Sequence, residues 1–219
     1  MQSWFANAKR ISSLNAEICF LLQNEFYFGP DRFPKDRERF IAPLTPPSMP
    51  LAVPSMVRTS EALNNEASLV AYYQHVIRLA RQHRLPFNSY RQHFWLRLWC
   101  WNTAEQVHIS FPWYDSNAEI QRVLDAVLAR ETGAIYDDED QGWAIEIHVN
   151  QGLLFIREGD PDDAEANTML CTPRDSFVDQ VTQLQTRSRA VIASLSNALG
   201  ADVWTEYVRG EPAFNDRQG

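Results

Sequence analysis

Residues 94–101 read FWLRLWCW, and this stretch predicts the centre of the fold. With a period of two, one face carries Phe94, Leu96, Leu98 and Cys100, and the other carries Trp95, Arg97, Trp99 and Trp101. Both faces are mainly apolar, as expected for a strand that is covered on both sides. A second alternating run follows at 107–111. The two runs predict a core hairpin over 92–111, although no glycine lies at its turn.

Helical patterns and further strands surround this hairpin. The expected helices cover residues 4–28, about 59–84, 116–132 and about 173–199. The expected strands cover residues 134–136, 143–149, 153–157 and 168–171, with the second and third forming a second hairpin. Helices that alternate with hairpins predict an α+β fold. We expect an antiparallel or mixed sheet of four to six strands, built from two hairpins and covered by three to four helices.

The length of 219 residues predicts a single α+β domain over residues 1–219. Residues 1–57 form its N-terminal arm, in which a helix precedes a proline-rich extended segment, and residues 58–219 form the main body. Five prolines between Pro43 and Pro54 exclude a helix and a central strand there. Leucine, valine and methionine side chains among them predict that the segment packs against its own domain.

The composition favours a globular protein of a reducing compartment. The hydrophobic share is 45%, which is enough for a core, and no apolar run reaches the roughly 18 residues that a membrane helix needs. The three cysteines, Cys19, Cys100 and Cys171, are scattered, which predicts buried thiols and argues against a disulfide framework or a zinc site. We therefore expect a cytoplasmic protein that does not bind a membrane.

The charge is distributed unevenly along the chain. The net charge is −8, but residues 1–100 hold 12 Lys and Arg against 7 Asp and Glu, whereas residues 101–219 hold 8 against 21. Residues 137–165 alone contain ten acids and one base, Arg157. Such a field repels nucleic acid and favours a basic partner. An acidic surface that only keeps the protein in solution is the alternative explanation.

Short catalytic and cofactor-binding motifs are absent from the sequence. It contains neither a glycine-rich phosphate loop nor a G-x-S-x-G elbow, H-E-x-x-H or C-x-x-C. An EF-hand loop that began at Asp137 would have His148 at its twelfth position, where a bidentate glutamate is required. We therefore expect no cofactor and no metal ion.

These observations lead to a first hypothesis, a non-catalytic protein that binds a basic protein partner. An acidic cytoplasmic domain without catalytic motifs suits an inhibitor or immunity protein that neutralises a toxin in a bacterium, because complementary charge speeds association and selects the partner. The expected partner-binding residues are Asp137, Asp138, Glu139, Asp140, Asp160, Asp162, Asp163, Trp101, Trp113 and Tyr114. The three aromatic residues are included because they lie at strand ends, and Trp and Tyr are frequent in binding hot spots.

Two alternative hypotheses remain open. If the two hairpins adjoin, His108, Glu146 and His148 share one sheet face and form a scattered acid–base site of an enzyme. Alternatively, the proline-rich arm and the long last helix serve assembly in a structural or adaptor subunit. The sequence leaves the oligomeric state open.

Overall fold

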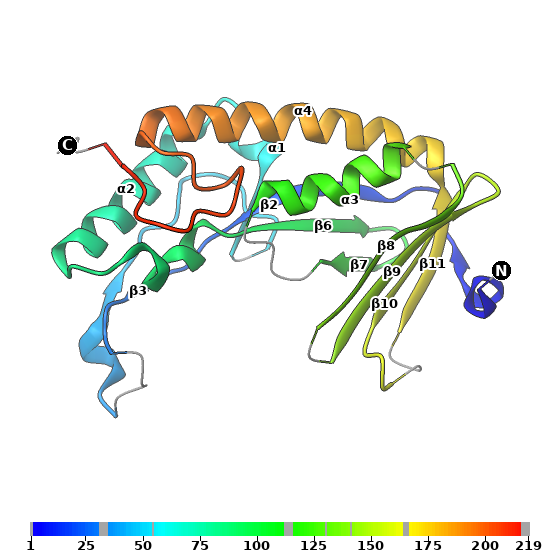
Figure 1. Cartoon of the computed structure of the whole chain (residues 1–219), viewed down its shortest axis with the longest axis horizontal. Helices are drawn as coiled ribbons and strands as arrows, with labels where there is room; N and C mark the ends of the chain where they lie inside the picture. The colour runs from blue at the N-terminus through cyan, green and yellow to red at the C-terminus, as the bar shows by residue number, and fades with distance from the viewer. Residues whose placement is uncertain are drawn as a thin grey trace. The chain divides into compact units, whose positions relative to one another are not determined.

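The structure is a computed structural model that describes residues 2–30, 35–53, 55–111, 116–129, 131–140, 142–163 and 167–215. It confirms the α+β class, with a mixed five-stranded sheet, a four-stranded antiparallel sheet and helices α1–α4 (Figure 1). The chain divides into two compact units. Unit 1 contains Met1–Glu17, Leu98–Pro112 and Glu119–Thr186, and unit 2 contains Ile18–Arg97, Trp113–Ala118 and Arg187–Gly219. The expected single domain stays a prediction.

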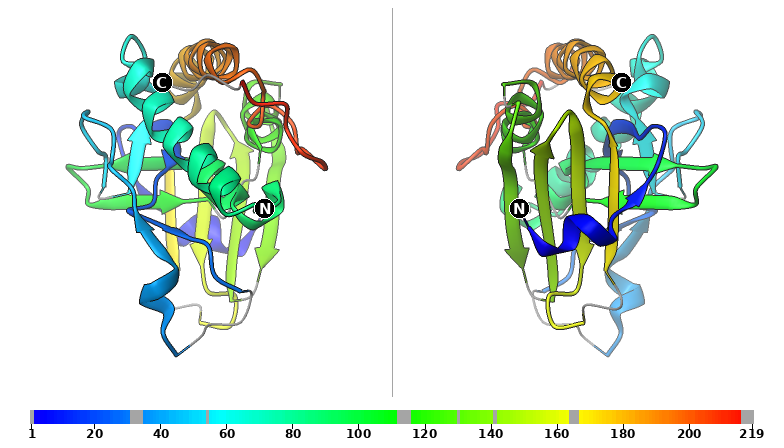
Figure 2. Two further views of the ribbon diagram at one scale, coloured as in Figure 1. Left: turned by 90° about the vertical axis from the view of Figure 1, so that its left-hand side faces the viewer. Right: turned by 90° about the vertical axis from the view of Figure 1, so that its right-hand side faces the viewer.

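The five-stranded sheet belongs to unit 1. Its strands, in spatial order, are β1 (Lys9–Arg10), β11 (Thr168–Pro173), β10 (Leu153–Gly159), β9 (Trp143–Asn150) and β8 (Gly133–Asp140). β1 is parallel to β11, and the other neighbours are antiparallel. The predicted hairpin of β9 and β10 is confirmed, and β8 forms one edge of the sheet (Figure 2).

Alternating side chains give this sheet two different faces. Ile145, Ile147 and Val149 of β9 are buried on one face, where Leu154 and Ile156 of β10 lie opposite Val149 and Ile147. Residues that are paired across strands share a face, so these side chains form a continuous apolar surface, called here the core face. Burial of each such side chain contributes roughly 1.5–3 kcal/mol to folding.

A short 3-10 helix, η1 (Ser3–Asn7), covers part of the opposite face, called here the outer face (Figure 2, right). Trp4 is buried there with Phe155 and Cys171, and the ring of Phe5 is stacked on that of Phe155 with centroids 4.2 Å apart. The Trp4 ring meets the Phe5 ring edge to face at 4.8 Å. The start of the chain therefore supplies an apolar cover for the outer face.

Helices α3 (Asn117–Ala129) and α4 (Arg174–Leu199) contact each other within unit 1. The guanidinium of Arg174 donates hydrogen bonds of 2.9 Å to the carbonyls of Val127 and Leu128, and so satisfies acceptors at the C-terminal end of α3. Gln185 Nε2 donates to Asp125 Oδ1 over 2.7 Å. The sequence predicts both helices correctly.

Residues 96–101 of the stretch FWLRLWCW lie in the four-stranded sheet. Its strands, in spatial order, are β5 (Met56–Arg58), β2 (Asn15–Leu21), β6 (Leu96–Asn102) and β7 (Val107–Ser110). β6 and β7 form the predicted hairpin, preceded by two 3-10 turns, η3 (Phe87–Ser89) and η4 (Arg91–Phe94). A small third sheet pairs β3 (Glu25–Tyr27) with β4 (Ile41–Pro43), next to η2 (Arg37–Phe40).

An aromatic cluster forms the core of unit 2. The indole of Trp204 is fully buried, with ring centroids 6.1 Å from Phe20, 5.1 Å from Tyr73 and 5.6 Å from Phe94. Trp204 follows the last helix in sequence, so the tail packs back on its unit, as the sequence predicts. Within the described residues, no helix combines the length and the apolar character that a membrane crossing needs.

The expected N-terminal helix over 4–28 is wrong, because η1, β1, β2 and β3 occupy this segment. The apolar residues at spacings of three and four suggested a helix stripe. However, the five residues from Ala16 to Phe20 are all buried, including Glu17, as in a strand that is covered on both faces. Such a strand has no alternation and cannot be told from a helix by periodicity.

The helix expected over about 59–84 is interrupted. α1 (Thr59–Ala62) and α2 (Glu66–Gln82) are separated at Asn64, which has a φ of 69°. Asparagine tolerates this left-handed conformation better than most residues, so the Asn64-Asn65 pair permits the break. The extended packing of the proline-rich segment stays a prediction.

The turn between β6 and β7 lacks glycine, and the side chain of Asn102 stabilises it instead. Asn102 is buried; its Nδ2 donates to the Ser13 carbonyl over 2.7 Å, and its Oδ1 accepts from the Glu105 amide over 3.0 Å. Asn102→Ala leaves both backbone groups without these bonds, so we expect the free energy of unfolding to fall by about 1–3 kcal/mol. Chemical denaturation measures this change. The control is Asn197→Ala on the exposed side of α4, and an equal effect of both variants would contradict this role.

Candidate functional site

The acidic run at residues 137–140 is part of β8. We expected a strand over only 134–136, but β8 continues through the run and pairs with β9, with Asp137 opposite Glu146 and Asp138 opposite Ile145. Because β8 is the terminal strand of the sheet, the run lies on a sheet edge. Asp137 and Glu139 are exposed, whereas Asp138 is half-buried and accepts a hydrogen bond of 2.9 Å from the Tyr136 hydroxyl.

The second acidic segment reaches the same end of the sheet. Gly159, the last residue of β10, pairs with Ala144, which pairs on its other side with Glu139. The chain then turns, and Asp160 Oδ1 accepts a hydrogen bond of 2.9 Å from the Asp162 amide, as in an Asx turn. The structure thus brings together two segments that are about 20 residues apart in sequence. We call residues 137–140 and 158–163 the acidic end.

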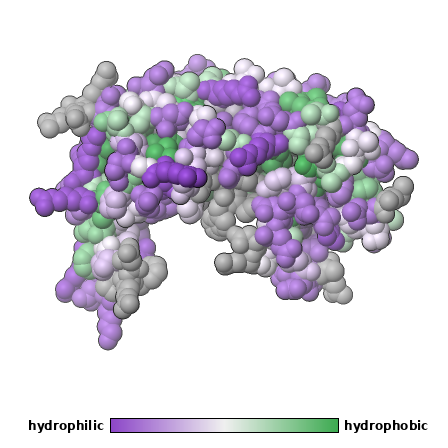
Figure 3. Space-filling view, viewed as in Figure 1, coloured by the Kyte–Doolittle hydropathy of each residue, from purple (hydrophilic) through white to green (hydrophobic). Residues whose placement is uncertain are grey.

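Hydrophilic side chains dominate the surface at this end of the strands (Figure 3). Asp162 and Asp163 are exposed, like Asp137 and Glu139. The one basic residue within 137–165, Arg157, forms an ion pair with Glu146 on the outer face. Its charge is thus engaged by a carboxylate outside the acidic end.

Glu158 is a partly buried carboxyl of the acidic end whose pKa is shifted. It lies on the core face opposite Ile145, and its Oε1 accepts a hydrogen bond of 2.8 Å from Trp143 Nε1. Burial raises the pKa of the Glu158 carboxyl above its ordinary value of 4.5, and the bond from Trp143 offsets part of this shift. The folded state therefore disfavours the ionised form of this side chain.

The outer face next to the acidic end carries a polar network. Glu146 accepts a hydrogen bond of 3.2 Å from Trp4 Nε1, pairs with Arg157, and lies 3.7 Å from His148 Nε2. The His148 ring meets those of Trp4 and Phe5 edge to face, at 6.0 and 5.5 Å between centroids. Glu146 and His148 thus lie together, as the enzyme hypothesis expects.

His108 is not part of this arrangement, because the two hairpins belong to different sheets. His108 lies in β7 of the four-stranded sheet, whereas Glu146 and His148 lie in β9 of the five-stranded sheet. The condition that the two hairpins adjoin in one sheet, under which His108 would join Glu146 and His148, is therefore not met. Both hairpins have apolar faces, and the sequence pattern does not distinguish one large sheet from two.

Trp101, one of the three aromatic candidates, lies in a different sheet from the acidic run. Trp101 is in β6, half-buried, with its ring stacked on that of Trp99 at 4.4 Å and its backbone opposite His108. Trp113 and Tyr114 lie outside the described residues. The structure therefore does not unite Trp101 with the acidic residues in one sheet.

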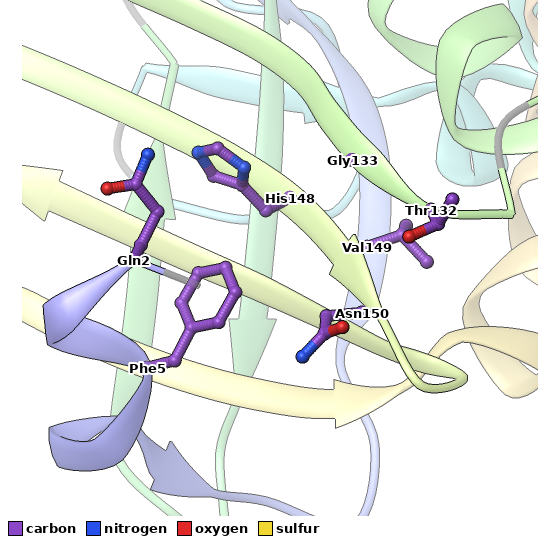
Figure 4. Close-up of a pocket in the computed structure, with 7 residues that line it drawn as sticks. All are labelled: Gln2, Phe5, Thr132, Gly133, His148, Val149 and Asn150. Atoms are coloured by element: carbon purple, nitrogen blue, oxygen red, sulfur yellow. The ribbon is translucent and has the colours of Figure 1, made fainter.

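A pocket of about 360 Å³ opens on the outer face beside His148 (Figure 4). Its lining residues are Gln2, Phe5, Thr132, Gly133, His148, Val149 and Asn150. Except for His148, sequence reasoning missed these residues. Gln2 precedes the segment that was expected to be a helix, and Phe5 lies at its start. Thr132 and Asn150 are short polar residues at strand ends, where the sequence shows no pattern that would indicate a site.

Cys100 and Cys171 do not supply a reactive thiolate. All three are buried and free, which confirms the expected buried thiols. Burial raises the pKa of the Cys100 thiol to about 12 and also raises that of Cys171. A thiol that stays protonated at neutral pH is a poor nucleophile and a poor metal ligand. Among the residues that the structure describes, no group of three His, Cys, Asp or Glu side chains is placed to hold a metal ion.

Comparison with known proteins finds no matching family model, no matching curated protein and no matching solved structure. The function must therefore be argued from the residues and their geometry.

The raised pKa of Glu158 predicts a pH-dependent stability. Between 4.5 and the raised pKa, the folded state binds more protons than the unfolded state, so this carboxyl makes stability fall as pH rises. Glu158→Gln keeps an oxygen acceptor for Trp143 and removes the charge. We expect it to raise the melting temperature at pH 7, with a gain over the wild type that shrinks towards pH 4.

Thermal unfolding across pH 4–8 measures this difference. Glu139→Gln, at an exposed position of the same acidic end, is the matched control for the loss of one charge. If both variants change stability with the same pH profile, then burial of Glu158 is not the cause.

Proposed function

We propose that this chain is a non-catalytic binding protein of the inhibitor or immunity type, which engages a basic protein partner through its acidic end. The partner class that suits this charge best is a basic toxin domain, and the setting is the cytoplasm of a bacterium. One observation carries the proposal: two acidic segments separated in sequence meet at one end of one sheet.

The concentration of acidic residues at one end of the sheet favours a binding role over a role in solubility alone. An acidic surface that only prevents aggregation needs no concentration of charge, whereas here Asp137 and Glu139 of β8 lie at the same end of the sheet as the acidic segment 160–163 that follows β10. A concentrated field accelerates encounter with an oppositely charged protein and fixes its orientation.

The position on an edge strand supports the same proposal. Carboxylates along a sheet edge oppose pairing with a second copy of the chain, because like charges would face each other. The same edge suits an extended basic segment of another protein, whose backbone would continue the sheet while its Lys or Arg side chains meet Asp137 and Glu139.

The alternatives are less well supported. The enzyme hypothesis retains Glu146 and His148 but no longer has His108 in the same sheet. Trp101 stays a candidate for partner binding on a separate surface. No observation singles out the adaptor hypothesis.

Charge reversal tests the proposal. The purified chain serves as bait in extracts of its native cell at low and at high salt, and we expect one stoichiometric basic protein that is lost at high salt. Asp137→Lys combined with Glu139→Lys should slow association with that protein about 10-fold or more, because electrostatic steering is reversed. The melting temperature should not fall, since both side chains are exposed.

The matched control combines Asp179→Lys with Glu206→Lys, which changes the net charge equally at exposed positions elsewhere in the chain. Association rates measured by surface plasmon resonance separate the two variants. Equal rates for both would show that net charge alone matters, and an unchanged rate for the β8 variant would refute the proposed interface.

A further inference from the structure

The pocket on the outer face has lining residues that carry no permanent charge. Among the described residues that line it, none is Asp, Glu, Lys or Arg, and the polar side chains are two carboxamides, one hydroxyl and one imidazole. A charged ligand would find no counter-ion among these described side chains. The many acids of unit 1 also disfavour an anion. The pocket therefore suits an uncharged molecule.

Two aromatic rings form a corner in this pocket. The planes of Phe5 and His148 are inclined by 69°, with centroids 5.5 Å apart. Phe5 is held by its stacking on Phe155, and His148 is held between Glu146 and the ring of Trp4. A planar ligand that stacks on one ring therefore meets the edge of the other. This corner exists before any ligand arrives, which lowers the entropic cost of binding.

The polar groups around the corner match the edge of a planar heteroaromatic ring. In Figure 4, Gln2 and Phe5 lie on one side of the pocket and Thr132 on the other, with His148 and Asn150 on the strand between them. The carboxamides of Gln2 and Asn150 and the hydroxyl of Thr132 each donate and accept hydrogen bonds. Side-chain carboxamides recognise nucleobase edges in this way, and aromatic side chains stack on the bases.

The volume is compatible with such a ligand. About 360 Å³ lies at the lower end of the range for small-molecule sites, which runs from roughly 300 to 1,000 Å³. We propose that this pocket binds a free, uncharged nucleobase or nucleoside, stacked against Phe5 and hydrogen-bonded by Asn150, Gln2 and Thr132. This site is independent of the acidic end and of its partner.

Isothermal titration calorimetry with adenosine, guanosine, cytidine and uridine tests this assignment. We expect saturable binding of at least one nucleoside to the full chain, and weaker binding of its 5′-monophosphate, because the phosphate adds negative charge. Absence of binding for all four nucleosides at millimolar concentration would overturn the proposal. Tighter binding of the monophosphate would overturn the assignment of an uncharged ligand.

Variants locate the site. Phe5→Leu and Asn150→Leu should each weaken binding of that nucleoside about 5- to 150-fold, the effect of losing one stacked ring or one bidentate base contact. Phe40→Leu and Asn197→Leu are the matched controls outside the pocket, and they should bind like the wild type. Thr132→Val, at an exposed position, removes only a hydroxyl and keeps the test informative if a larger change impairs folding. Wild-type affinity in all three pocket variants would overturn the assignment.

Discussion

The docking of Trp4 on the outer face is the interaction on which the surface of unit 1 depends. Its indole is buried against Phe155 and donates to Glu146, which in turn contacts Arg157 and His148. Without η1, the apolar side chain of Phe155 would be open to water. Glu146 would also lose the hydrogen bond that it accepts from the uncharged indole of Trp4. One short helix thus converts a sheet face with mixed side chains into an ordered surface with a pocket at its border.

Both faces of the five-stranded sheet are at least partly covered, and this determines where its charged side chains lie. The core face takes the aliphatic residues, η1 covers part of the outer face, and the exposed carboxylates occupy the strand ends and the terminal strand β8. Glu158 marks the boundary, since it lies on the core face at the acidic end and burial raises its pKa. The acidic end is therefore a concentrated feature of one unit, and this concentration is the observation on which the proposed binding role depends.

Elements with one exposed face could be predicted from the sequence, whereas of the two strands buried on both faces β6 was predicted and β2 was not. The alternation in β9 and the apolar stripe of α3 each reflect contact with water on one side, and both predictions are confirmed. β2 lacks such alternation, because Glu17 is buried with its neighbours, and it was mistaken for a helix. The assignment of the two hairpins to separate sheets depends on long-range packing that no local pattern encodes. The acidic residues were identifiable from composition alone. The pocket residues Gln2, Phe5 and Asn150 were not, since only the docking of η1 brings them together.

Hydrogen exchange of the chain, measured free and bound to the basic partner captured from its native cell, shows whether the acidic end is the interface. If the acidic end is the interface, backbone amides of β8 and of residues 158–163 gain protection in the complex, and those of α2 do not. Protection confined to α2, or to the β6–β7 hairpin that carries Trp101, would contradict the account, as would the failure to find any basic partner.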